Sequence, residues 1–234
     1  NFSTVSACAS SANAIIEGYN YIRYGILQVA VVGGSEAAIS PSAIGGFEAM
    51  RAMTVRNDDP TTASRPFDAD RDGFIMGEGC GCLVIEELEH ALKRNAKIYG
   101  EIVGCGLSSD AYHITAPHPE GLGAMLCMQR ALTDAKLQKN DIDHINTHGT
   151  STPAGDISEA IAISKLFGEH AKNIVLNSIK SMTGHLLGGS GAIEAIATVL
   201  SIKNSIIPPT INHFKDDPNI DPNLDFNYWK SREK

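Results

Sequence analysis

The chain has 234 residues, 43% of them hydrophobic and 20% charged, so it can bury a substantial core as one large or two small domains. Its formal net charge of -8 at pH 7 argues against a generally basic, nucleic-acid-binding surface. No apolar run is long enough to suggest a membrane span, and the first residues lack the basic and apolar regions of a signal peptide.

Strand and helix patterns alternate along the first half of the chain. Apolar residues at helical spacing predict a helix over residues 11–23. Residues 28–34 are an apolar run that ends in glycines, which is typical of a strand buried on both faces. The other elements expected in this half are a short helix near 41–51, a strand over 82–85, a helix over 87–94 and a strand over 98–107.

The second half repeats this alternation. A proline at position 153 suits the first turn of a helix, which we expect to extend to Phe167. The other expected elements are helices over 121–135 and 191–203 and strands over 142–146 and 174–176, with 212–234 irregular. Alternating strands and helices predict an α/β fold with a largely parallel sheet.

Two histidines follow expected strands of the second half. His148 comes after the strand over 142–146, and His185 comes after the strand over 174–176, each in a turn that leads to a helix. Ligands of α/β proteins bind at the carboxyl ends of parallel strands. This placement makes both histidines candidate functional residues.

Cys8 lies just before the first expected helix and is a candidate nucleophile. The positive end of a helix dipole and the free N–H groups of the first turn lower the pKa of a cysteine and can form an oxyanion hole. A thiolate together with two imidazoles suits acyl transfer through a thioester. The alternative for a single cysteine is a small buried hydrophobe, and the position of Cys8 alone leaves that alternative open.

The five cysteines are an odd number without the spacing of a disulfide framework. They therefore fit a reducing compartment, and we expect a cytoplasmic protein. Cys80 and Cys82 lack the second pair or the nearby histidine that a zinc site needs, so we interpret them as small residues in or before a buried strand. No metal site is predicted.

Three motifs carry a resemblance to a known family. They read VSACASS at 5–11, NTHGTSTP at 146–153 and KSMTGH at 180–185, and together they resemble the elongating β-ketoacyl-[acyl-carrier-protein] synthases. Further similar stretches are VGGSE at 32–36, RPFDADRDGF at 65–74, MGEG at 76–79 and SSDAYHITAP at 108–117. The resemblance implies a thiolase-like layered α/β/α/β/α architecture. Residues 1–107 would belong to its N-terminal half and 108–234 to its C-terminal half.

The resemblance also implies a reaction, the decarboxylative Claisen condensation of fatty-acid biosynthesis. Cys8 would carry an acyl chain, while His148 and His185 would stabilise the enolate formed from malonyl-acyl-carrier protein. This chemistry needs no metal or organic cofactor. The implied partners are acyl-carrier protein, with acyl and malonyl groups on its phosphopantetheine arm, and a second copy of the chain in a homodimer.

Further residues receive roles by the same resemblance. Supporting roles fall to Lys180 and Glu194, which stand in stretches otherwise poor in charge, and to Asp156. Substrate binding falls to Thr150, Thr152, Phe47 and Arg51, the threonines on the phosphopantetheine arm, Phe47 in the acyl pocket and Arg51 against the carrier protein. A packed aromatic for Phe47 and a solvated surface arginine for Arg51 are equally good interpretations.

The sequence departs from the family pattern at both ends. It lacks the strands that precede the nucleophile in this family and a Gly-Phe-Gly-Gly-type loop that completes the oxyanion hole. We therefore expect a fragment with an incomplete hole. The alternative functions are a polyketide-type ketosynthase domain, an inactive module that only binds the carrier or dimerises, and a decarboxylase that does not need Cys8.

Overall fold

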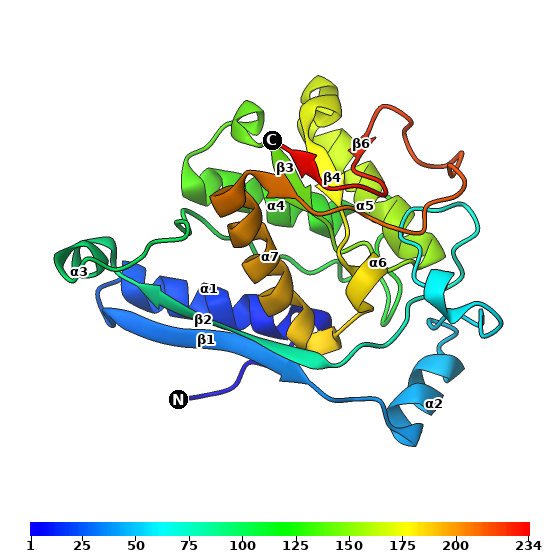
Figure 1. Cartoon of the computed structure of the whole chain (residues 1–234), viewed down its shortest axis with the longest axis horizontal. Helices are drawn as coiled ribbons and strands as arrows, with labels where there is room; N and C mark the ends of the chain where they lie inside the picture. Colours follow the sequence, from blue (N-terminus) through cyan, green and yellow to red (C-terminus); the bar gives the residue numbers. More distant parts are fainter. The chain divides into compact units, whose positions relative to one another are not determined.

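The computed structural model describes all 234 residues, Asn1–Lys234 (Figure 1). The chain forms two compact units, and each unit is built from three separate stretches. The first unit comprises 1–43, 76–102 and 185–206, and the second comprises 44–75, 103–184 and 207–234. Each unit thus takes residues from both halves of the sequence, and the expected division after residue 107 stays a prediction.

The first unit is built on two long strands, β1 (Val29–Glu36) and β2 (Gly79–Glu86), which pair antiparallel (Figure 1). Helices α1 (Ser10–Arg23) and α7 (Ser190–Asn204) pack on this pair and on each other. The prediction of a largely parallel sheet is wrong for this unit. Local hydrophobicity marks a strand but does not specify the direction of its partner.

Only one face of the β1–β2 pair is covered by helices, so the predicted burial on both faces is also wrong. Val31 and Val84 lie opposite each other and are 71% and 63% exposed. Cys80 and Cys82 are exposed as well, which corrects their interpretation as buried residues. Side chains alternate across a strand, and the helices contact only the other set.

The second unit holds a parallel sheet in the order β3 (His144–Asn146), β4 (Val175–Asn177) and β6 (Asp225–Phe226). Helix α5 (Pro153–Phe167) connects the first two strands and packs against α4 (Leu122–Ala135). The buried core beside the sheet comprises Leu132, Ala160, Ile163, Leu166, Phe167, Ala171, Ile174, Leu176 and Leu224. The parallel sheet expected for this part of the sequence is confirmed.

Two expectations for irregular and extended segments are corrected. The strand expected over 98–107 is absent, because no other strand pairs with this segment; Gly104 and Gly106 pack against the backbone of α4. The segment over 212–234 is not wholly irregular, since β6 joins the sheet from it.

The remaining expected helices and strands are confirmed within a few residues. Elements not yet given are α2 (Pro41–Ala49), α3 (Leu88–Lys93), α6 (Lys180–Thr183), β5 (Ile206–Ile207) and β7 (Arg232–Glu233). None of the helices combines the length and the apolar character needed to cross a membrane.

Candidate functional site

Cys8 lies in a tight turn of the first unit, the short helix η1 (Ala7–Ala9) that runs directly into α1. Ala7 has a φ of +50°, a left-handed conformation that is uncommon for a residue with a side chain. The hydroxyl of Ser10 stabilises this turn: it donates to the Ala7 carbonyl at 2.7 Å and accepts the Ser6 N–H at 2.9 Å. Cys8 is half-buried there, beside the first turn of α1.

His185 of the same unit contacts the Cys8 sulfur, with Nε2 2.9 Å from Sγ. On the other side of the ring, Nδ1 accepts the Leu187 N–H at 3.3 Å and lies 2.9 Å from the Ser190 hydroxyl. A backbone N–H can only donate, so Nδ1 is the acceptor and the proton of the neutral ring is on Nε2. His185 therefore presents an N–H donor to the sulfur.

The segment after His185 is bound to the rest of the first unit by hydrogen bonds. The Gly77 N–H donates to the His185 carbonyl at 2.9 Å, and the Glu36 carboxylate accepts the Gly188 N–H at 3.1 Å. The Ser11 hydroxyl accepts the N–H of Ala192 at 3.0 Å. These contacts hold the start of α7 against α1 and the end of β1, and they fix the position of the histidine relative to the cysteine.

His148 belongs to the second unit and follows β3 directly. Its backbone is held from two sides, because the Glu159 carboxylate accepts its N–H at 2.6 Å and the Lys180 ammonium donates to its carbonyl at 2.6 Å. Glu159 also accepts the Gly149 N–H at 2.8 Å. Burial raises the pKa of Glu159, while these N–H groups and the charge of Lys180 oppose the shift.

Glu159 was missed by the sequence reasoning, which paired Lys180 with Glu194. The available signal was a carboxylate in α5 on a helix otherwise rich in alanine and isoleucine. Lys180 is buried, as expected for a lysine with a defined partner. Its pairing with Glu194, a half-buried residue of α7, stays a prediction.

Thr150 and Thr152 form a pair in the turn after His148. Their hydroxyl oxygens lie 2.9 Å apart, and Thr150 is buried. The Ser178 hydroxyl donates to the Gly149 carbonyl at 2.7 Å and supports the same turn. Two paired hydroxyls retain one donor and several acceptor sites, so this turn can bind a ligand with amide groups.

Asp156 lies in the first turns of α5 and is completely buried. One carboxylate oxygen accepts the Phe67 N–H at 2.8 Å and lies 3.4 Å from Nε of Arg71. Burial nevertheless raises the pKa of Asp156 to about 7, because the loss of hydration outweighs Arg71 and the N–H donor. The carboxyl group thus titrates near neutral pH.

The two remaining predicted residues lie at and just after the end of α2. Phe47 is half-buried and packs edge-to-face on Phe74, with ring centroids 5.2 Å apart. Arg51 is exposed and has a left-handed φ of +52°. The roles of Phe47 in an acyl pocket and of Arg51 against a carrier protein stay predictions.

The structure thus brings together two groups of the predicted residues. Cys8 and His185 are in direct contact in the first unit, and His148, Lys180 and the threonine pair surround one turn of the second unit. Their catalytic and binding roles stay predictions.

Sequence comparison finds two matching domain families. One is described as "Beta-ketoacyl synthase, N-terminal domain" and matches residues 1–91, and the other is described as "Beta-ketoacyl synthase, C-terminal domain" and matches residues 99–214. Similar curated proteins are called 3-oxoacyl-[acyl-carrier-protein] synthase 2. The one from Synechocystis sp. is 53% identical over 99% of this chain and 55% of its own length. The one from Coxiella burnetii is 49% identical over 100% of this chain and 56% of its own length.

Solved structures are similar over nearly the whole chain. The AntDE:AntF complex, a type II PKS acyl-carrier protein with its ketosynthase bound to the hexaketide, matches with a TM-score of 0.94 and 38% identity over 97% of this chain and 56% of its own. A β-ketoacyl synthase from Burkholderia phymatum matches with a TM-score of 0.93 and 42% identity, over 99% and 55%. These matches confirm the thiolase-like α/β fold class. The chain spans about half the length of the curated relatives it matches.

Proposed function

This chain belongs to the β-ketoacyl synthase family, and from that premise we propose that it carries the nucleophile and both histidines of a condensing enzyme. The proposed reaction elongates a fatty acyl chain on acyl-carrier protein, as the name shared by the curated relatives suggests. The observation that carries the proposal is the contact between Nε2–H of His185 and the Cys8 sulfur.

The first half of the reaction is an acyl transfer. The Cys8 thiolate attacks the acyl thioester on the carrier, a new thioester forms on Cys8, and the phosphopantetheine sulfur leaves as a thiolate. The N–H of His185 favours the thiolate over the thiol, since a hydrogen bond to the charged form stabilises it. The second half needs no further nucleophile from the protein.

In the second half, the malonyl thioester loses carbon dioxide and its electron pair forms an enolate. His185 and His148 would donate N–H bonds to the enolate oxygen, each contributing about 3 kcal/mol to transition-state stabilisation, as a single oxyanion-hole donor does. The carbanion attacks the Cys8 thioester, a carbon–carbon bond forms, and the thiolate leaves. Lys180 and Glu159 hold His148 for this step, and Asp156 and Glu194 are assigned supporting roles.

Substrate contacts complete the proposal. Thr150 and Thr152 would bind the amides of the phosphopantetheine arm, Phe47 would line the acyl pocket, and Arg51 would meet the acidic carrier protein. The similar ketosynthase of the AntDE:AntF complex has an acyl-carrier protein bound, which supports such a partner. We also propose that the chain forms a homodimer. We propose a cytoplasmic location as well, since exposed free thiols such as those of Cys80 and Cys82 persist in a reducing compartment.

A polyketide-type ketosynthase is the second candidate function. The match to the type II PKS ketosynthase favours it, with a TM-score of 0.94. The fatty-acid assignment is preferred because identity is 38% to that ketosynthase and 53% to the curated synthase from Synechocystis sp..

The test is self-acylation of Cys8. The chain is incubated with acyl-carrier protein charged with a saturated acyl chain, and its intact mass is measured. We expect the mass to rise by one acyl group in the unaltered chain and to stay unchanged in Cys8→Ala. An unaltered chain that gains no mass would overturn the proposal. Preferential transfer from a poly-β-keto donor would favour the polyketide alternative.

A further inference from the structure

The motif at 65–74 has no role in the proposed reaction, yet in the structure it holds the turn that carries the threonine pair. Ser151 lies between the two threonines and is completely buried. Its hydroxyl accepts the Arg65 N–H at 3.1 Å, and its carbonyl accepts the Gly73 N–H at 3.0 Å. Both ends of the motif therefore bind the same residue of the turn.

Ser151 needs such support, because its φ of +69° lies in the left-handed region. A residue with a side chain pays a conformational cost of about 1 kcal/mol or more there and stays only when its surroundings hold it. Its two neighbours point their hydroxyls at each other across 2.9 Å. Relaxation of Ser151 would change the relative orientation of those two hydroxyls.

Arg71 extends the same contact to the start of α5. Its guanidinium donates to the Thr152 carbonyl at 3.2 Å and to the Pro153 carbonyl at 2.8 Å. It also forms an ion pair with Asp217 at 2.7 Å, and its side chain is only 2% exposed. The buried Arg71 thus connects the residues after Ser151 to the C-terminal segment, 212–234.

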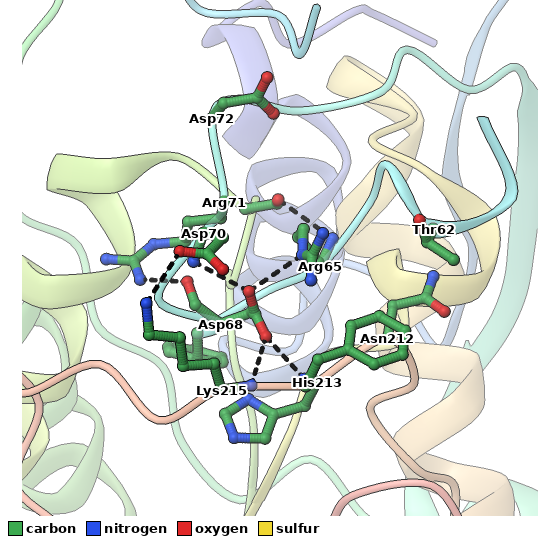
Figure 2. Close-up of polar contacts among 12 residues, drawn as sticks. Thr62, Arg65, Asp68, Asp70, Arg71, Asp72, Asn212, His213 and Lys215 are labelled. Carbon is green, nitrogen blue, oxygen red and sulfur yellow. Dashed lines mark hydrogen bonds and ion pairs between the residues drawn. The ribbon is translucent and has the colours of Figure 1, made fainter. Parts of the chain in front are cut away.

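Asp68, in the middle of the motif, binds the motif to the C-terminal segment. Figure 2 shows its carboxylate between the Arg65 side chain and the backbone next to Lys215. One oxygen accepts the N–H groups of Phe214 at 2.6 Å and Lys215 at 2.8 Å, and the other pairs with Arg65 at 3.0 Å. Burial would raise the pKa of Asp68, but backbone N–H donors and Arg65 outweigh it and keep that pKa low. The carboxylate is therefore charged and fully engaged at neutral pH.

From these contacts we infer that residues 65–73 are a positioning element for the phosphopantetheine arm. They fix the left-handed Ser151, and through it the orientation of the Thr150 and Thr152 hydroxyls, while Asp68 anchors them to the C-terminal segment. This inference rests on the proposed function, which assigns binding of the arm to the two threonines. Ser151 and Asp68 act through the threonines and do not themselves contact the ligand.

The decisive variant is Ser151→Ala, with Ser158→Ala as its matched control. Both serines are buried and each loses one hydrogen bond, but the Ser158 hydroxyl donates to the His118 carbonyl, away from the threonine pair. The dissociation constant of phosphopantetheine is measured by calorimetry on the whole chain, together with the midpoint of thermal unfolding. We expect Ser151→Ala to weaken binding about fivefold, the effect of one lost hydrogen bond, and Ser158→Ala to leave it unchanged.

A second pair of variants tests the positioning role separately from the proposed binding of phosphopantetheine by the threonines. Thr150→Val tests the threonine contact itself, and Asp68→Asn should weaken binding as Ser151→Ala does, because an amide cannot accept all the N–H donors around Asp68. If phosphopantetheine does not bind the unaltered chain, the proposed binding site and this inference both fail. If Thr150→Val weakens binding while Ser151→Ala and a folded Asp68→Asn bind normally, only the positioning role is overturned. Equal losses in Ser151→Ala and Ser158→Ala would overturn it too, since they indicate a general loss of structure.

Discussion

At the scale of single residues, the hydrogen bond to one ring nitrogen of a histidine decides whether the other ring nitrogen donates or accepts. Because Nδ1 of His185 accepts the Leu187 N–H, the ring proton is on Nε2. Nε2 lies 2.9 Å from the Cys8 sulfur, so its N–H is directed to that sulfur. A ring protonated on Nδ1 would act as a base toward the thiol instead. The observed arrangement therefore suits stabilisation of a thiolate or an oxyanion.

A prediction follows for the reactivity of Cys8. Replacing His185 by alanine removes an N–H donor from the thiolate, so we expect alkylation of Cys8 by iodoacetamide at pH 7 to slow about tenfold. The smaller side chain would widen access to the sulfur, so a steric effect has the opposite sign. His90→Ala, in α3 of the same unit, is the control and should alkylate at the unaltered rate. Equal rates in both variants would contradict the assigned hydrogen bond.

At the scale of elements, small residues let helices approach the β1–β2 pair closely. A Cβ atom on Gly18 of α1 would lie 2.4 Å from Cγ1 of Val32 and 2.9 Å from Cδ1 of Ile85. Gly81 of β2 has a similar relation to Ala192 of α7, at 2.9 Å. These contacts bring α1 and α7 against the sheet and thereby set the positions of Cys8 and His185 at their ends.

Alanine substitutions in two helices test this packing. Gly18→Ala should destabilise the chain by about 1–3 kcal/mol, because a branched valine side chain cannot move aside without a shift of the strand. Gly45→Ala in α2 has no heavy atom within 4 Å of the added Cβ, and we expect it to stabilise the chain by up to about 1 kcal/mol. Urea unfolding followed by circular dichroism measures both. A neutral Gly18→Ala would show that the helix is not tightly packed.

At the scale of the whole molecule, buried carboxyl groups couple folding of the second unit to pH. Burial raises the pKa of Asp156 from its ordinary 3.8 to about 7 and raises that of Glu159 as well. A folded state that holds a proton more tightly than the unfolded state loses stability as the pH rises from the unfolded pKa to the folded pKa, which for Asp156 is from 3.8 to about 7. Asp68 has the opposite sign, and its contribution is lost only in acid.

The free energy of unfolding should therefore depend on pH through Asp156. We expect the stability of the unaltered chain, relative to Asp156→Asn, to fall as the pH is raised from about 4 to about 7, since the asparagine does not titrate. Urea unfolding of both chains at several pH values measures this difference, and titrating groups that do not interact with Asp156 cancel in the comparison. A difference that is constant over this range would show that Asp156 has an ordinary pKa.

The secondary structure was largely predictable, because helix and strand signals come from neighbouring residues. The helical spacing of apolar side chains predicted α1, and Pro153 indicated the start of α5. The prediction of a strand over 98–107 was wrong, because a strand needs a hydrogen-bonded neighbour and no strand of this chain pairs with that segment. Propensity carries no information on such a distant contact.

Sequence alone determined the family, and it marked Cys8, His148 and His185 as the candidate catalytic residues, since three short motifs encode groups whose chemistry depends on residue type. Only the tertiary structure decided which proton His185 presents and that Glu159 holds the backbone of His148. It also decided that residues 65–73 bind Ser151. The physical reason is that a hydrogen bond depends on distance and direction between groups far apart in the sequence, and folding alone brings those groups within 3 Å or so of each other.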